Sequence, residues 1–154
     1  MNTCNMIANT LSYIMKVVID TSVWISALIK KESSARELLR LIFRDKVFPQ
    51  MSEALFYEYE AVMMKRKKIQ KLTPLTTEEQ ERLFYAYLSS CKWNEIYYMW
   101  RPNLKDENDN FIVELAVASG VEYIITYNIK DFQNPELIFK HKVITPEQFI
   151  KEFK

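Results

Sequence analysis

Short apolar runs rich in β-branched residues alternate with helical stretches along this chain, and this alternation constrains the fold most strongly. Residues 15–20 (MKVVID) form one such run, and residues 122–128 (EYIITYN) form another. Short, nearly continuous apolar runs are typical of strands buried on both faces of a parallel sheet. Three further short strands are predicted at VFPQM, EIYYM and HKVIT, residues 47–51, 95–99 and 141–145. We therefore expect a mainly parallel sheet of about four to five strands.

The segments between these strands are predicted to contain helices, because apolar residues recur there at helical spacing. Residues that favour the start or the end of a helix support these predicted helices. Thr21 or Ser22, then Ser52 and Thr77, are candidate N-caps, and Gly120 suits the position just after a helix end. The predicted helices lie within residues 21–30, 31–46, 52–68, 73–91, 109–120 and 146–153. Strands that alternate with helices indicate an α/β layered fold.

The composition excludes several function classes. Gly120 is the only glycine, so neither a dinucleotide-binding glycine motif nor a P-loop can be written in this chain. His141 is the only histidine, which argues against a histidine-based triad or a zinc cluster. Cys4 and Cys91 are far apart and have no metal-ligand spacing, which favours a reducing, cytoplasmic setting. The formal net charge is +1, so nucleic-acid binding would need a local basic patch.

The first fourteen residues differ from the rest of the chain. They carry neither a positive segment nor a continuous apolar core, so they do not resemble a signal peptide. No stretch of the chain is long and apolar enough to span a bilayer. We expect an N-terminal extension at residues 1–14, followed by a single domain at residues 15–154.

Polar side chains follow the two most apolar strands at the point where each strand ends. Asp20 ends the first strand, and Asn128 and Asp131 follow the second. Asp109 lies at the start of a helix, and Glu58 lies within one. Sites in parallel sheets form outside the carboxyl ends of the strands, so these side chains are expected to converge there.

Convergent carboxylates repel one another unless a cation lies between them. Oxygen ligands suit Mg²⁺ or Mn²⁺, and a site of this kind can hydrolyse phosphodiesters by activating water. The chemistry expected from these residues is therefore metal-assisted phosphoryl hydrolysis.

Four segments also resemble the motifs of PIN-domain nucleases. VVIDTSVWISAL is similar to the opening motif, in which an Asp ends the first strand and Thr or Ser follows. MSEALFYEYEAVMMKRKK resembles the second motif, a helix that begins with Ser and carries an inward Glu. DENDNFIVELAVASGVEYIITYNIKDF resembles the third and fourth motifs: an Asp-Asn pair opens a helix, and a buried strand ends in Thr-x-Asn/Asp-x-x-Asp-Phe. The resemblance covers residues 15 to about 150.

Within this family the chain looks most like the VapC-like toxins of bacterial and archaeal toxin–antitoxin pairs. The resemblance implies a three-layer α/β/α sandwich and an endoribonuclease that depends on Mg²⁺ or Mn²⁺. It also implies an RNA substrate, an antitoxin partner that holds the enzyme inactive, and a homodimer.

The same resemblance assigns residue roles. It implies that Asp20, Glu58 and Asp109 are catalytic metal ligands, with Glu60 as the competing choice for Glu58. Many family members carry Asp where this chain has Asn128, and others carry Asn there with an acid three residues later. We therefore assign the fourth carboxylate to Asp131 and an orienting or water-binding role to Asn128. Thr21 and Thr126 are expected to support the metal ligands. Asp106 is a further acid expected near the mouth of the site.

Two alternatives remain open at this level. The basic run at Lys65, Arg66, Lys67 and Lys68 is either a solvated helix end or a contact for RNA phosphates. The chain as a whole is either a nuclease or a non-catalytic module of the same fold that binds RNA or a partner protein. A nuclease acting on structured DNA is the third possibility.

Overall fold

The computed structural model of the chain describes residues 14–96, 110–132 and 139–154. Within these residues a five-stranded sheet has the order β3–β2–β1–β4–β5, and each neighbouring pair of strands is parallel. Because every strand runs in the same direction, all carboxyl ends meet at one edge of the sheet. The strands are β1 (Met15–Ile19), β2 (Val47–Met51), β3 (Lys92–Trp93), β4 (Tyr123–Ile125) and β5 (Lys142–Ile144).

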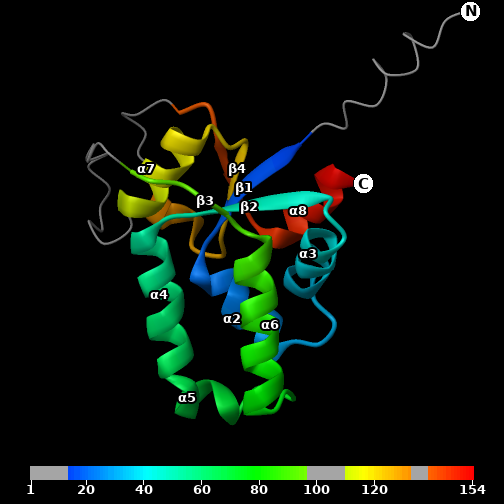
Figure 1. Ribbon diagram of the computed structural model, residues 1–154. Coiled ribbons are helices and arrows are strands. Elements are labelled where there is room, and N and C mark those ends of the chain that lie inside the picture. Colours follow the sequence, from blue (N-terminus) through cyan, green and yellow to red (C-terminus); the bar gives the residue numbers. More distant parts are fainter. Residues whose placement is uncertain (1–13, 97–109, 133–138) are drawn as a thin grey trace, which may run out of the picture.

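Helices cover this sheet on both sides. Helix α7 packs against β1, β2 and β4, whereas α3 packs against β2 and against α2, α6 and α8. Figure 1 shows α7 on one side of the central strands and α3 and α8 on the other. The predicted three-layer α/β/α sandwich is therefore confirmed. The helices are α2 (Thr21–Ile29), α3 (Ser34–Phe43), α4 (Glu53–Met64), α5 (Arg66–Gln70), α6 (Thr77–Ser90), α7 (Asn110–Ser119), the 3₁₀ helix η3 (Ile129–Phe132) and α8 (Pro146–Phe153).

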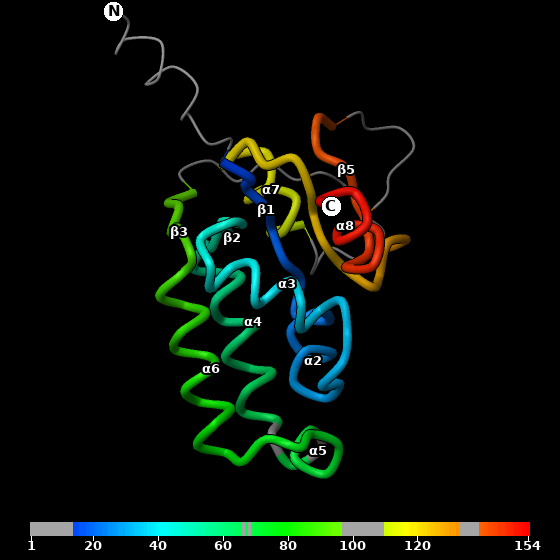
Figure 2. The backbone as a smooth tube through the Cα atoms, turned by 90° about the vertical axis from the view of Figure 1, so that its right-hand side faces the viewer, coloured from blue at the N-terminus to red at the C-terminus, as the bar shows by residue number. Residues whose placement is uncertain are grey.

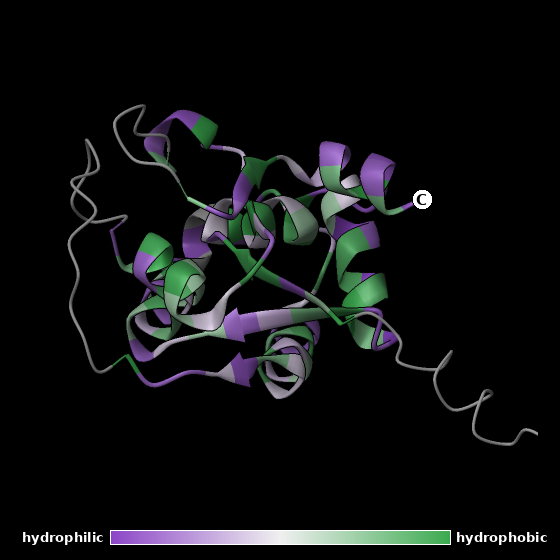
Figure 3. Ribbon diagram, turned by 90° about the horizontal axis from the view of Figure 1, so that it is seen from above, coloured by the Kyte–Doolittle hydropathy of each residue, from purple (hydrophilic) through white to green (hydrophobic). Residues whose placement is uncertain are grey.

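The second half of the central strand β1 is deeply buried, as its apolar run predicts. Val17, Val18 and Ile19 are at most 2% exposed. Hydrophobic segments gather where strands and helices meet, and hydrophilic ones lie on the outer turns (Figure 3). No helix in the described part of the chain is long and apolar enough to cross a membrane.

Helices α4 and α6 run side by side away from the sheet, with α5 at their far end (Figures 1 and 2). A buried aromatic cluster joins this pair to α2. The Trp24 ring lies 5.1 Å from that of Tyr87 and 6.1 Å from that of Tyr59. The Tyr59 hydroxyl donates to the carbonyl oxygen of Ile19 at 2.7 Å and lies 3.1 Å from the Tyr87 hydroxyl. This bond fixes the rotation of α4 relative to the end of β1.

Cys91, a buried cysteine of this region, is expected to be unreactive. Cys91 contacts Tyr87, and burial raises the pKa of its thiol to about 12. A thiol with so high a pKa stays protonated at neutral pH and reacts poorly. The other cysteine, Cys4, lies outside the described residues.

Two predicted helix starts are wrong by one or two residues. Asp20 itself occupies the N-cap position of α2, ahead of Thr21 and Ser22. Thr76, not Thr77, caps α6: its hydroxyl accepts from the Glu79 N–H at 3.1 Å, and the Glu79 carboxylate accepts from the Thr76 N–H at 2.9 Å. This reciprocal pair is a capping box, and it requires Thr three residues before Glu. The Ser52 cap is as the sequence indicates, and Ser33 caps α3.

Two other segments also differ from expectation. Helix α4 ends at Met64, and the basic run begins at its C-cap, Lys65, and continues into the separate short helix α5. A strand that was not predicted, β3, forms at Lys92–Trp93, which pair with Gln50 and Met51 of β2. Glu95 and Ile96 of the predicted strand at residues 95–99 lie in no strand. Residues 97–99 of the predicted strand lie outside the described residues.

His141, the residue just before β5, is buried. It is 8% exposed, and its ring stacks on that of Phe139 at 4.9 Å. Within the described residues its buried Nε2 atom has no hydrogen-bond partner. It precedes β5, so it lies at the sheet edge opposite the carboxyl ends.

This burial predicts a loss of stability in mild acid. Burial lowers the pKa of His141 below its usual value of 6.5, so the unfolded chain binds this proton at a higher pH than the folded chain does. The free energy of unfolding should therefore fall as the pH drops below about 6.5. Urea unfolding at pH 7.5 and pH 5.0 measures this change, with His141→Leu as the non-titrating reference. An equal change in both proteins would contradict the assignment to His141.

Candidate active site

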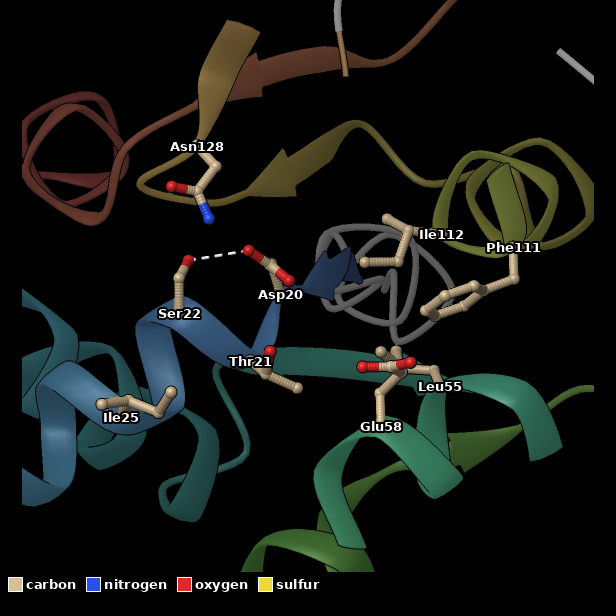
Figure 4. Close-up of a pocket in the computed structure, with 9 residues that line it drawn as sticks. All are labelled: Asp20, Thr21, Ser22, Ile25, Leu55, Glu58, Phe111, Ile112 and Asn128. Atoms are coloured by element: carbon tan, nitrogen blue, oxygen red, sulfur yellow. Dashed lines mark hydrogen bonds between the residues drawn. The ribbon is translucent and has the colours of Figure 1, made fainter. Parts of the chain in front are cut away.

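A pocket of about 210 Å³ opens at the carboxyl edge of the sheet. Four segments far apart in the sequence form it: the β1–α2 junction, α4, the first turn of α7 and the turn after β4 (Figure 4). This is the edge where the sequence predicts a site. The lining residues are Asp20, Thr21, Ser22, Ile25, Leu55, Glu58, Phe111, Ile112 and Asn128.

The Asp20 carboxylate is held at the bottom of this pocket. It is 7% exposed, and its backbone N–H donates to the carbonyl oxygen of Ile125 at 3.0 Å. The hydroxyls of Ser22 and Thr126 both donate to its Oδ2 atom, at 2.7 and 2.8 Å. Among the described residues, these are the hydrogen bonds that the carboxylate accepts. Its Oδ1 atom is therefore the oxygen left to bind a ligand.

The turn after β4 is tied to the same two hydroxyls. The Thr126 Oγ1 atom accepts from the Asn128 N–H at 2.9 Å, and the Ser22 Oγ atom accepts from the Tyr127 N–H at 3.1 Å. Figure 4 shows the Asn128 amide directed toward Asp20. Thr126 therefore contacts both the Asp20 carboxylate and the turn after β4. Ser22 was not singled out for the site, although it stands directly after Asp20 and Thr21.

Glu58 enters the pocket from α4. It lies one turn after Leu55, which also lines the pocket, and the carboxylates of Glu58 and Asp20 face a common space (Figure 4). Its neighbour Tyr59 is fully buried and sets the helix rotation that presents Glu58. Glu60, the competing choice, does not line this pocket.

The remaining predicted residues divide into two groups. Asp131 is exposed in η3 and does not line the pocket; its N–H donates to the Asn128 carbonyl oxygen at 3.0 Å. Asp109 and Asp106 lie outside the described residues. Within residues 14–96, 110–132 and 139–154, no group of three or more His, Cys, Asp or Glu side chains could hold a metal ion.

The basic run lies at some distance along α4 from this pocket. Lys65 and Lys67 are exposed, beyond the end of α4. The side chains of Arg66 and Lys68 lie outside the described part of the structure. Of the two side chains that the structure describes here, neither Lys65 nor Lys67 lines the pocket.

The donor set in the pocket suits a hard cation. Asp20 and Glu58 offer carboxylate oxygens, the ligands that Mg²⁺ and Mn²⁺ prefer, and Asn128 adds a neutral amide. The apolar side chains of Phe111 and Ile112 form one wall. The pocket thus combines oxygen ligands with a partly apolar rim at a strand-end position.

Sequence comparison assigns the chain to a known family of proteins. The PIN-domain profile matches residues 16–130. The uncharacterised protein MJ1680 of Methanocaldococcus jannaschii is 30% identical over 155 residues, which cover 91% of this chain and 92% of that protein. The chain belongs to the PIN-domain family, whose members are generally nucleases.

Solved structures show the same fold. The chain is similar to one from VapBC2 of Rickettsia felis, crystallised with a DNA fragment from its promoter. The TM-score is 0.55 and the identity 18%, over 85% of this chain and 98% of that one. PAE2754 of Pyrobaculum aerophilum matches with a TM-score of 0.51 and 20% identity, over 92% of this chain and 96% of that one.

Proposed function

We propose that this protein is a metal-dependent endoribonuclease and the toxin of a toxin–antitoxin pair. One observation carries the proposal: Asp20, Glu58 and Asn128 come from separate segments and line a single pocket at the carboxyl edge of the sheet. Membership of a nuclease family and the likeness to a VapBC2 chain support it.

In this proposal Asp20 and Glu58 bind Mg²⁺ or Mn²⁺ together with Asp109, and Asn128 orients the substrate or a water molecule. Asp131 does not line the pocket and is left out of this ligand set. When bound, the cation supplies positive charge that stabilises the phosphodiester transition state and lowers the pKa of water. Ser22 and Thr126 hold the Asp20 carboxylate in place. Thr21 lines the pocket beside them and is a further supporting residue.

The proposal also includes a cellular location, a substrate and protein partners. The protein would act in the cytoplasm on RNA, as a homodimer, and a cognate antitoxin would block the pocket. Lys65, Arg66, Lys67 and Lys68 would contact RNA phosphates. Positive side chains that neutralise phosphates give binding that weakens with salt.

One observation favours a second candidate function. Asn128 lines the pocket, whereas the nearby acid Asp131 is exposed and does not. A neutral amide attracts a cation less strongly than a carboxylate does. The second candidate is therefore a non-catalytic PIN-domain module that binds RNA or a partner protein.

Two glutamates of α4 provide a matched test. Glu58→Gln removes a charge inside the pocket, and Glu60→Gln removes the same charge two residues away, outside it. We expect Glu58→Gln to lower kcat/KM for Mn²⁺-dependent RNA cleavage by about 10²-fold and Glu60→Gln to change it by less than about threefold.

The readout is cleavage of a labelled single-stranded RNA, with a DNA hairpin of the same sequence alongside. Equal losses in both variants would contradict the role of Glu58. Cleavage of the hairpin in preference to the RNA would move the proposal to a DNA nuclease. No cleavage of either by the wild-type protein would favour the non-catalytic module.

A further inference from the structure

A second pocket shares the turn after β4 with the candidate active site. Its volume is about 460 Å³, and Tyr127 lines it, while the next residue, Asn128, lines the first pocket. Two consecutive residues therefore line the two different pockets. The other lining residues are Lys30, Glu32, Ser33, Ser34, Glu37, Arg40 and Glu147.

Tyr127 is exposed and yet firmly held. Its side chain is 37% exposed, but its hydroxyl donates to Glu147 Oε1 of α8 at 2.8 Å and also contacts Ser26 of α2. Its N–H donates to Ser22, whose hydroxyl in turn bonds to Asp20. An exposed aromatic ring fixed at both ends offers a flat surface that loses little entropy when a ligand stacks on it.

The charges around this second pocket argue against a phosphate as its ligand. Three acids, Glu32, Glu37 and Glu147, outnumber the two cations, Lys30 and Arg40. Lys154 forms an ion pair with Glu37 at 3.4 Å, from outside the lining set. A pocket that offers both acceptors and donors, with no excess of positive charge, suits a neutral group that carries both kinds of hydrogen-bonding atom.

We infer that this pocket binds the base of a nucleotide next to the scissile phosphodiester, with the Tyr127 ring as its stacking surface. A nucleobase has a flat aromatic face, N–H donors for Glu32 and Glu147, and acceptors for Lys30 and Arg40. The inference rests on the proposed nuclease function, because it makes single-stranded RNA the ligand that spans both pockets.

The test compares two exposed tyrosines in the full-length protein. Fluorescence anisotropy measures binding of a labelled single-stranded RNA in EDTA, where no metal-dependent cleavage occurs. Tyr127→Ala should weaken binding by about 5- to 150-fold, the range for loss of one base–aromatic stack. Tyr127→Phe, which keeps the ring, should stay within about threefold of wild type. Tyr85→Ala is the control, because Tyr85 is 64% exposed on α6 and lines neither pocket.

A second ligand distinguishes the loss of a base contact from a general loss of binding by the variant. An oligonucleotide of the same length that lacks all bases should bind the wild-type protein and Tyr127→Ala equally. An unchanged RNA affinity in Tyr127→Ala, or an equal loss on the abasic oligonucleotide, overturns the inference. Cleavage of the RNA by the wild-type protein in Mn²⁺ is scored separately, so a failure of the proposed function is distinguishable from a failure of this subsite.

Discussion

Replacement of Asp20 by Asn is expected to abolish RNA cleavage, with a loss in kcat/KM on the order of 10³-fold. The introduced asparagine has the same size, and its amide oxygen can accept the bonds that Ser22 and Thr126 now donate to Oδ2. Its NH₂ group then occupies the position of Oδ1 in the pocket. A donor in place of an anionic oxygen repels a cation, so the metal site is lost while the surrounding hydrogen bonds are kept.

Thermal melting gives this prediction a second readout. A ligand that binds only the folded protein stabilises it, by about 2.7 kcal/mol at a concentration one hundred times its Kd. Mn²⁺ should therefore raise the Tm of the wild-type protein and leave that of Asp20→Asn unchanged, whereas the two proteins should melt at similar temperatures in EDTA. Wild-type cleavage by the Asp20→Asn variant, or an equal Mn²⁺ shift in both proteins, would rule out the proposed role.

The parts of the fold that follow from local sequence were predictable. The runs at β1 and β4 are short, apolar and β-branched, and they are buried as their pattern predicts. The edge strand β3 was not predictable, because it depends on pairing with β2. Asn94 donates to the Met51 carbonyl oxygen at 2.8 Å and to the Gln50 side chain at 3.1 Å. Such long-range bonds, which local β propensity does not encode, place β3 at Lys92–Trp93.

The positions of the candidate site residues likewise depend partly on local sequence and partly on long-range contacts. Strand direction brings Asp20 and Asn128 to one edge, and this follows from the parallel sheet alone. The choice between Glu58 and Glu60 depends on the rotation of α4, which the Tyr59–Ile19 hydrogen bond fixes across 40 residues of sequence. The placement of Asp131 depends on the turn into η3, for which residue spacing gives no direction. Ser22 could have been found from its position in the Asp-Thr-Ser run.

The largest stability effect is expected at Trp24, which links the pocket to the helical pair of α4 and α6. Its side chain is 1% exposed and packs against Tyr59, Phe84 and Tyr87, with ring centroids 5.1 to 6.1 Å away. Its indole N–H donates to the Met63 sulfur at 3.3 Å. Trp24→Ala should lower the free energy of unfolding by about 3–5 kcal/mol, since it removes this contact area and leaves a cavity.

Trp93→Ala is the matched control, because Trp93 is 51% exposed on the edge strand β3 and contacts the Phe56 ring at 5.5 Å. A partly exposed tryptophan buries less area, so its replacement should cost less than half as much as that of Trp24. Urea denaturation with linear extrapolation measures both values. Equal costs would mean that the aromatic cluster does not stabilise the fold. If the cluster does hold α4 in place, Trp24→Ala should also weaken Mn²⁺ binding, because Glu58 depends on the rotation of that helix.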